Sequence, residues 1–236
     1  MANKFQSKAK LVERIEHNQK FIECVFEVVM PFCQPLLAGQ YVSLKVGEPN
    51  TLRSYSICSN PADSGRFNLM VDVTPQGIGT TFLQKSEIGT EVEILGPLGR
   101  FTLSDGVENK PVVLIGTGSG VAPLRAMILD LLRNRKTTQE VKLLWGERFF
   151  EDLIWQEELK NLVSEFPNFK YMPVISRPEE TDQCTKGRVT DCLQGMEIPN
   201  NGEYYLCGGK AMIDDVVVIL QNKGVAPTSI FHEKFD

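Results

Sequence analysis

The sequence lacks the cysteine and histidine patterns of a metal centre. Its six cysteines are Cys24, Cys33, Cys58, Cys184, Cys192 and Cys207. No two of them lie two or four residues apart, the spacing of zinc knuckles and iron–sulfur sites, so we interpret most as small, buried apolar residues. His17 and His232 are the only histidines. We therefore expect no metal site, and a Ser-His-Asp hydrolase has no supporting motif.

Long apolar runs and an excess of basic residues are also missing. The longest apolar runs, Val112–Ile115 and Val216–Leu220, are far shorter than the ~18 residues that indicate a membrane span, and the polar first residues contain no apolar signal core. The net charge of -5 argues against general nucleic-acid binding but allows a local basic patch. We expect a cytoplasmic protein with neither a membrane nor a nucleic-acid partner.

The first part of the chain, residues 1–105, is predicted to be a β-rich domain. The whole chain has 236 residues, of which 42% are apolar and 23% charged, and this length suits one large domain or two ordinary ones. Six strand-like segments are separated by Gly, Pro, Asn and Asp: residues 9–17, 20–29, 39–46, 54–58, 66–73 and 91–96. They favour a barrel or a sandwich. Residues 75–85, PQGIGTTFLQK, are typical of a loop that opens a short helix.

The second part, residues 106–236, begins within the polar loop SDGVENKP and alternates strands with helices. The strand-like segments are residues 111–118, 141–148, 169–176 and 204–209, and the helix-like segments are 121–136, 151–166, 187–194 and 211–224. This alternation predicts βαβ units, and therefore a doubly wound parallel sheet with helices on both faces. The first helix carries an apolar stripe formed by Leu124, Met127, Ile128, Leu131 and Leu132.

A candidate phosphate site lies at Gly116–Arg125, GTGSGVAPLR. Glycines between a buried strand and a helix allow the backbone to approach a ligand closely, and a helix start favours a phosphate. The spacing is G-x-G-x-G and departs from the dinucleotide fingerprint, because its last position is Val121. A tight strand-to-helix turn without a ligand is the alternative.

Basic residues follow the next strands of this domain. They are Arg148, Arg177, Lys186 and Arg188, with Ser176 among them. Because ligands bind at the C-terminal edge of such sheets and guanidinium groups match phosphate oxygens, this set would suit the 2′-phosphate of NADP; a solvated charged loop is the alternative. Tyr205–Met212, YLCGGKAM, brings Cys207 to the same edge, where a buried structural thiol is the alternative.

The stretch Arg53–Pro61, RSYSICSNP, is unusual for a strand between apolar segments. Alternation places Arg53 and Tyr55 on one face and Ser54 and Ser56 on the other. A cation, a phenol and two hydroxyls within four residues fit neither a buried strand nor a plain surface strand. An ordinary polar edge strand is the alternative to a functional site, and the rest of the chain must decide between them.

An ordered set of motifs spans the chain: RxYS, G-x-x-T-T, GPLGRF, GTGSGVAP, WGER, SR, CGG and a final aromatic residue. This ordered set resembles that of the ferredoxin–NADP reductase family. That family also includes flavin reductases and the reductase components of oxygenases. The resemblance extends from about Lys10 to Asp236. It implies an antiparallel β-barrel domain that binds FAD, followed by the doubly wound α/β domain that binds NAD(P).

The resemblance also implies roles for residues of the first domain. In the family, the arginine matching Arg53 pairs with the flavin pyrophosphate, the aromatic matching Tyr55 packs on the isoalloxazine, and the serine matching Ser56 points at flavin N5. The remaining matches to FAD-binding positions are Ser54, Val71, Val73, Gly77, Gly79, Thr80 and Thr81. For Val71 and Val73, a place in the barrel core is an equally good interpretation.

In the second domain the resemblance implies a nicotinamide site. The residues that we predict to bind NADP, from the resemblance or from the basic cluster described above, are Thr117, Gly118, Gly146, Arg148, Ser176, Arg177, Lys186, Arg188, Cys207, Gly208 and Met212. Cys207 matches a thiol near the reacting nicotinamide, and Phe235 matches the aromatic that covers the flavin. Two features depart from the family pattern. Gly209 replaces the usual proline or asparagine, and the chain continues one residue past Phe235 instead of ending in the terminal tyrosine of the plant enzymes. A phenylalanine at this position is closer to oxygenase reductase components.

The resemblance implies an oxidoreductase that transfers hydride between NADPH and FAD, with Ser56, Cys207 and Phe235 at the reacting groups. Since no iron–sulfur cysteines are present, the one-electron carrier would be a separate protein, ferredoxin or flavodoxin, and we expect a monomer. The alternatives are a flavin reductase, the reductase component of an oxygenase, and a non-catalytic flavin-binding subunit of a larger redox complex. The physiological acceptor and the direction of electron flow stay open.

Overall fold

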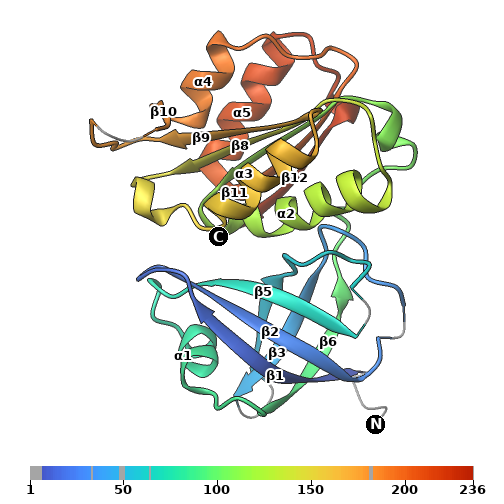
Figure 1. Cartoon of the computed structure of the whole chain (residues 1–236), viewed down its shortest axis with the longest axis vertical. Coiled ribbons are helices and arrows are strands. Elements are labelled where there is room, and N and C mark those ends of the chain that lie inside the picture. The colour runs from blue at the N-terminus through green and yellow to red at the C-terminus, as the bar shows by residue number, and fades with distance from the viewer. Residues whose placement is uncertain (1–6, 33, 48–50, 64, 181–182, 236) are drawn as a thin grey trace. The chain divides into compact units, whose positions relative to one another are not determined.

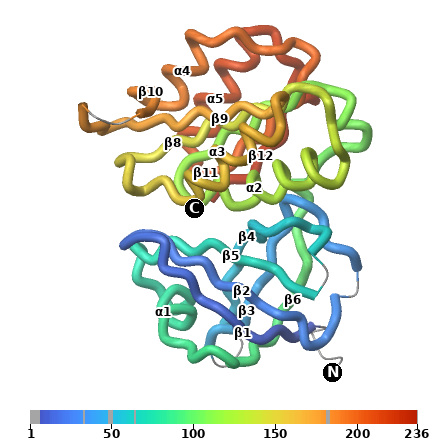
Figure 2. Tube along the Cα trace, viewed as in Figure 1, coloured from blue at the N-terminus to red at the C-terminus, as the bar shows by residue number. Residues whose placement is uncertain are grey.

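The computed structural model describes residues 7–32, 34–47, 51–63, 65–180 and 183–235. The chain divides into two compact units, residues 1–103 with 125–130, and residues 104–124 with 131–236. Each unit contains one six-stranded sheet, and the strands of each sheet can be followed in Figures 1 and 2.

The first unit is an antiparallel sheet that closes on itself. Its strands are β1 (Ser7–Glu16), β2 (Phe21–Met30), β3 (Tyr41–Gly47), β4 (Thr51–Ser56), β5 (Arg66–Asp72) and β6 (Glu91–Leu98), in the order β4-β3-β6-β1-β2-β5. The two edge strands meet where Ile57 bridges Leu69, and the Cys58 N–H donates to the Asn68 carbonyl at 2.9 Å. The sheet is therefore a barrel, as predicted.

The barrel interior is apolar because alternate residues of each strand point inward. Leu11, Phe26, Leu44 and Leu69 are fully buried in this core. Val71 belongs to the core and is 1% exposed. Val73 is half-buried and packs against the core. Both valines therefore lie in or against the barrel core, as the alternative interpretation of these two residues expects.

One short helix, α1 (Ile78–Lys85), lies against the barrel. It begins where PQGIGTTFLQK predicts a loop followed by a helix. Leu83 faces inward, is completely buried and joins the barrel core. Eight residues are too few for an independently stable helix, so the position of α1 depends on its contacts with the strands.

The second unit is a parallel sheet between two layers of helices. Its strands are β7 (Val112–Thr117), β8 (Val141–Glu147), β9 (Phe169–Ile175), β10 (Thr185–Lys186), β11 (Glu203–Gly209) and β12 (Ile230–Phe235), in the order β10-β9-β8-β7-β11-β12. The order runs outward from β7 in both directions, which makes the sheet doubly wound, as predicted. The C-terminal ends of β7 and β11 lie on either side of this switch point, where ligands bind in such sheets.

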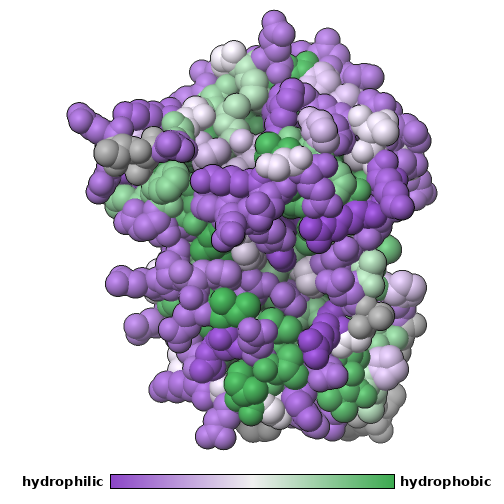
Figure 3. All heavy atoms as spheres, viewed as in Figure 1, coloured by the Kyte–Doolittle hydropathy of each residue, from purple (hydrophilic) through white to green (hydrophobic). Residues whose placement is uncertain are grey.

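Four helices connect these strands: α2 (Val121–Leu129), α3 (Gln156–Glu165), α4 (Val189–Gly195) and α5 (Lys210–Asn222). Figure 1 shows α4 and α5 on one side of the sheet and α2 and α3 on the other. Apolar residues of α4 and α5, among them Leu193 and Ile213, share a core with Ile115 and Leu206 of the sheet. The visible face of this unit is mostly hydrophilic (Figure 3), because its apolar residues point inward.

Some details differ from the sequence prediction. The apolar stripe predicted for the first helix is confirmed, since Leu124 and its four companions are at most 1% exposed, but the helix turns π-helical over Asp130–Asn134. Cys24, Cys58 and Cys207 are buried, as interpreted. Cys184 and Cys192 are only partly buried; Cys33 lies outside the described residues.

Two features are absent from the described part of the chain. No helix there combines the length and apolar character needed to cross a membrane. Within the same residues, no group of three or more His, Cys, Asp and Glu side chains is placed to hold a metal ion.

Candidate functional site

In the barrel, the start of α1 lies directly against two residues of β4. A Cβ atom added to Gly79 would lie 2.3 Å from the Tyr55 hydroxyl and 3.0 Å from the Arg53 Cβ. Tyr55 is half-buried and packs on the barrel core, whereas Arg53 is exposed and its guanidinium donates to the Leu52 carbonyl at 2.8 Å. Two segments predicted to bind flavin therefore meet, and they combine a cation, a phenol and a helix N-terminus.

The loop before α1 is shaped by the Thr80 hydroxyl. This oxygen accepts the Gly77 N–H at 2.9 Å and lies within donating distance of the carbonyls of Gly77, at 2.9 Å, and Pro75, at 3.1 Å. Thr81 is exposed, and its N–H donates to the Gly77 carbonyl at 2.9 Å. Since the first N–H groups of a helix have no partner within it and carry the positive end of its dipole, this turn suits a diphosphate.

The two serines of RSYS differ in their surroundings. Ser56 is the last residue of β4 and is 9% exposed, so the strand ends where strict alternation would place Ser56 opposite Tyr55. Ser54 is exposed, and its hydroxyl lies 2.9 Å from the Ser43 hydroxyl on β3. The Ser54 hydroxyl is thus occupied by a neighbouring strand.

In the α/β unit, glycines allow the backbone segments at the ends of β7 and β11 to converge. A Cβ on Gly120 would lie 2.2 Å from the Cys207 carbonyl oxygen, and one on Gly208 would lie 2.4 Å from the Thr117 hydroxyl. Gly118 has a φ of +57°, and a Cβ added to it would have no neighbouring atom within 4 Å. The turn is therefore tightly packed at Gly120, against the end of β11, and open at Gly118, where a ligand has room to approach the backbone.

Two further predicted residues lie around the Thr117 side chain. A Cβ on Gly146 would lie 3.0 Å from the Thr117 Cγ2 and 2.8 Å from Val189. The Met212 Cε would lie 3.0 Å from a Cβ on Gly208. Thr117, Gly146, Gly208 and Met212 thus form one neighbourhood at the C-terminal edge of the sheet.

Cys207 is a buried, neutral thiol. It is fully buried on β11 and lies opposite Gly116 on one side and Glu233 on the other. Burial raises the pKa of the Cys207 thiol well above its usual range, and the charge of Glu233 raises it further. Burial also raises the pKa of Glu233. Because only a thiolate is a good nucleophile, this cysteine can shape a site but is poorly suited to attack a substrate.

The predicted basic residues come together at the ends of three neighbouring strands. Backbone hydrogen bonds join Ser176 N–H to the Glu147 carbonyl at 3.1 Å and Arg177 N–H to the Arg148 carbonyl at 2.9 Å. The chain then pairs Lys186 with Ile175 in register. The side chains of this set are all exposed: Arg148, Ser176, Arg177, Lys186 and Arg188. Four cations at one edge of the sheet form a surface suited to a phosphate.

The final aromatic residue belongs to a strand that the sequence analysis missed. Phe235 is half-buried at the end of β12 and pairs in register with Gly209. The preceding Lys234 donates to Asp214 of α5 at 2.6 Å. The sequence contains only a weak signal for this strand, because in IFHEKF two apolar residues are followed by three polar ones before the final phenylalanine, and this pattern does not alternate.

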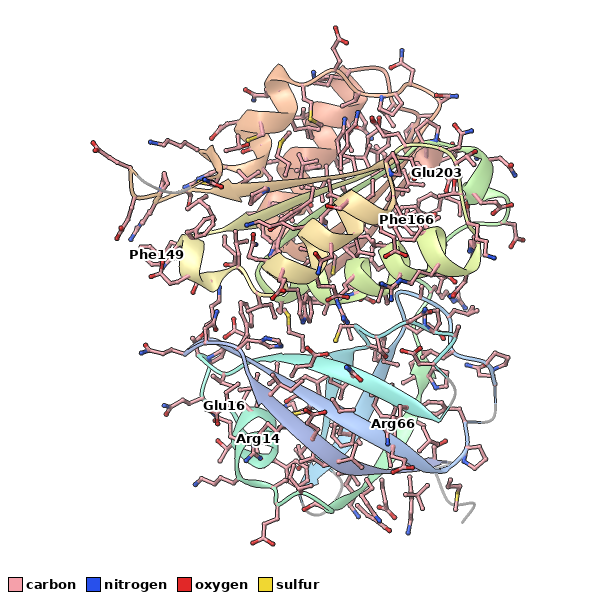
Figure 4. All side chains as sticks on the ribbon, viewed as in Figure 1. Arg14, Glu16, Arg66, Phe149, Phe166 and Glu203 are labelled. Carbon is pink, nitrogen blue, oxygen red and sulfur yellow. The ribbon has the colours of Figure 1, made fainter. Side chains whose placement is uncertain are left out.

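Phe149 is another residue that sequence reasoning missed. It follows Arg148 directly and is 38% exposed, which is unusual for a phenylalanine. Figure 4 shows it on the loop after β8. An exposed aromatic ring next to a cluster of cations offers a stacking surface for a base beside sites for its phosphates.

The residues present fit both predicted cofactors. A flavin with a diphosphate needs a cation, anion-binding amides and a flat apolar wall, and Arg53, the start of α1 and Tyr55 supply them. A nicotinamide dinucleotide phosphate needs an open glycine turn and a phosphate-binding cluster, and Gly118 with the four exposed cations supplies them. The contact of each residue with a cofactor stays a prediction.

Comparisons with known proteins cover both units. Residues 8–103 match the family model of the oxidoreductase FAD-binding domain, and residues 114–217 match that of the oxidoreductase NAD-binding domain. Among solved structures, a cytochrome P450 reductase of Amycolatopsis has a TM-score of 0.89 and 29% identity, covering 97% of this chain and 69% of that chain. A ferredoxin NADP+ reductase from Neisseria gonorrhoeae shares the fold, with a TM-score of 0.84 and 22% identity over 98% and 99% of the two chains.

The curated relatives are longer than this chain. The toluate 1,2-dioxygenase electron transfer component of Pseudomonas putida is 31% identical over 84% of this chain and 58% of its own length. The phenol 2-monooxygenase reductase component of Pseudomonas sp. is 32% identical over 85% and 58%. The two matched domains, which follow one another along most of the sequence, show that the chain belongs to the ferredoxin–NADP reductase-like family of FAD- and NAD-binding oxidoreductases.

Proposed function

We propose that this chain transfers electrons between NADPH and a separate one-electron carrier protein through bound FAD. The FAD domain spans residues 1–105 and the NADP domain residues 106–236. The observation that carries the proposal is the meeting of Arg53, Tyr55 and the start of α1 at Gly79, because it brings a cation, a phenol and the N-terminus of a helix together, which are the groups that a flavin with a diphosphate needs. Ferredoxin or flavodoxin is the carrier that we favour.

When bound, NADPH and FAD would supply the redox chemistry, hydride transfer and one-electron transfer respectively. The protein's part is to bind and align. Arg53 and the start of α1 neutralise the diphosphate, Tyr55 supports the ring system, and Ser56 donates a hydrogen bond at flavin N5. Cys207, as a neutral thiol, fills space beside the nicotinamide.

The preference for NADPH over NADH rests on the four exposed cations near Ser176. Bidentate guanidinium–phosphate pairs are strong and specific, and a 2′-phosphate is the group that distinguishes the two nucleotides. Exposed cations also attract the nucleotide before it binds.

The test of this proposal is anaerobic stopped-flow reduction of the full chain loaded with FAD. We expect rapid bleaching of the flavin absorbance by NADPH and slow bleaching by NADH. Equal rates of flavin reduction by NADPH and NADH would contradict the preference for NADPH but would still support a flavin-dependent reductase. A protein that shows no flavin absorbance after incubation with FAD would overturn the proposal.

Replacing Arg177 should change nucleotide selectivity. We expect Arg177→Ala to raise the apparent Kd for NADPH by about tenfold, the value of roughly one charge-assisted hydrogen bond, and to leave that for NADH within about twofold. The same stopped-flow assay measures both constants. Lys160→Ala, which removes an exposed cation from α3, is the control and should change neither. An equal loss for both nucleotides would show that Arg177 does not contact the 2′-phosphate.

Replacing Ser56 should slow the chemical step. We expect Ser56→Ala to lower the limiting rate of flavin reduction by about tenfold, the value of one hydrogen bond made in the transition state, with an unchanged Kd for NADPH. The saturation curve of the reduction rate separates the two constants. A limiting rate equal to that of the wild type would exclude the role of Ser56 at N5.

A second candidate is the reductase component of an oxygenase. It is favoured by the two relatives above, whose names describe dioxygenase and monooxygenase components. Reduction of ferredoxin or flavodoxin by the purified chain with NADPH would support the first candidate. Reduction of added free FMN without a carrier would support a flavin reductase instead, and FAD binding without NADPH-dependent dye reduction would indicate a non-catalytic subunit.

A further inference from the structure

Arg14 of β1 reaches the C-terminal end of α1. Its Nη1 donates to the Ser86 carbonyl at 2.8 Å and to the Leu83 carbonyl at 3.2 Å, and Figure 4 shows Arg14 next to this helix. The last carbonyls of a helix have no partner within it, and a cation is favourable at this end of the dipole. Arg14 therefore caps α1 from a strand that is distant in sequence.

The helix is held to the barrel by three contacts along its length. At its start, Gly79 lies against Arg53 and Tyr55. In its middle, Leu83 is buried in the barrel core. At its end, Arg14 provides the hydrogen bonds described above. An eight-residue helix has little intrinsic stability, so loss of one contact should loosen the whole helix, including its first turn.

We propose that Arg14 is a positioning residue of the FAD site, which holds α1 so that its first N–H groups face the flavin diphosphate. The inference rests on the proposed function, in which the start of α1 binds that diphosphate. Arg14 itself lies at the opposite end of the helix and pairs in register with Cys24, which is fully buried. Its effect on the cofactor is therefore transmitted through the helix.

The two halves of the flavin make the proposal testable. FAD carries the diphosphate, whereas riboflavin presents the same ring system without a phosphate. Titration of the flavin-free full chain with each ligand, followed by flavin fluorescence, gives two dissociation constants. We expect Arg14→Met to raise the dissociation constant for FAD by about tenfold, the effect of a lost helix cap. The dissociation constant for riboflavin should stay within about twofold of the wild-type value.

Two further variants separate the geometry from the charge. Arg14→Lys keeps a donor that can reach a carbonyl, and we expect FAD affinity within about threefold of the wild type. Lys85→Met removes another cation from the last turn of α1, an exposed one, and should change FAD affinity by less than about twofold. Amide hydrogen exchange in α1 of the flavin-free chain should accelerate in Arg14→Met alone.

The outcomes distinguish the inference from the proposed function. Wild-type protein that binds no FAD would overturn the proposed function, whereas exchange in α1 would still report whether Arg14 holds the helix. An Arg14→Met variant that loses FAD and riboflavin affinity equally would overturn the inference, because the residue would then support the barrel as a whole. Unchanged FAD affinity would also overturn it, even if exchange in α1 were faster, because the helix end would then not influence the cofactor.

Discussion

Gly79→Ala is expected to raise the Kd for FAD by about 100-fold or more. The added methyl group would lie 2.3 Å from the Tyr55 hydroxyl and 2.8 Å from the Arg53 Cγ, far inside van der Waals contact. The hydroxyl can swing away, but the Arg53 Cβ, at 3.0 Å, is fixed to the strand. The start of α1 must then move from β4, which separates the cation from the helix amides. When the arginine and the helix amides can no longer bind one diphosphate together, the free energy of FAD binding weakens by about 3 kcal/mol.

Equilibrium titration with FAD measures this effect, and circular dichroism of the same samples checks that the barrel is intact. Gly195→Ala is the matched control: it also adds one methyl group to a helical glycine, at the end of α4, but nothing lies within 4 Å of the new atom. It should leave the Kd for FAD within about twofold. A Gly79→Ala variant that binds FAD as tightly as the control would show that the contact of α1 with β4 does not form the site.

The contact at Gly79 shows which part of this site the sequence could predict. The motif G-x-x-T-T indicates glycines that bring backbone close to a ligand. In the structure, Gly79 is needed because protein atoms, those of Tyr55 and Arg53, occupy the space of its side chain. A local pattern predicts that a position must be small, but the partner belongs to a strand more than twenty residues away, and only the folded barrel identifies it.

The elements of the fold were predictable where hydrophobic periodicity is strong. The barrel strands and the four helices of the α/β unit follow that pattern. β10 has two residues, too few to show a period. β12 has no regular alternation of apolar and polar residues, and its place beside β11 is decided by long-range pairing. Arg14 was likewise invisible as a helix cap, because a charged residue in an alternating strand is ordinarily a solvent-facing one.

A buried carboxylate supports the α/β unit at the opposite edge of the sheet from the candidate nucleotide site. Glu203, labelled in Figure 4, is the first residue of β11. It is 3% exposed and accepts three hydrogen bonds: from Lys110 at 2.7 Å, from the Ser104 hydroxyl at 2.6 Å and from the Tyr205 hydroxyl at 2.8 Å. The Ser104 N–H in turn donates to the Tyr205 hydroxyl at 2.9 Å. The polar segment that precedes β7 is thereby attached to the sheet.

Glu203→Ala is expected to lower the free energy of unfolding of this unit by about 3 kcal/mol, because it leaves a buried hydroxyl and a cation without their acceptor. The only tryptophans of the chain are Trp145 and Trp155, both in this unit, so their fluorescence during urea unfolding reports on it. Glu140→Ala is the control, since it removes a more exposed carboxylate that pairs with Lys170, and should cost less than about 1 kcal/mol.

The pH dependence gives a second, independent readout. Burial alone raises the pKa of Glu203, but the hydrogen bonds from Lys110, Ser104 and Tyr205 outweigh it and hold the pKa below the usual value. A lowered folded-state pKa contributes stability that is fully present above the unfolded pKa, about 4.3 for glutamate, and is lost as the pH falls below it. The stability difference between wild type and Glu203→Gln should therefore be constant from pH 6 to pH 8, roughly the range above that titration, and shrink in acid. A difference that grows in acid would mean that the carboxyl is protonated in the native protein and that its three donors do not stabilise the charge.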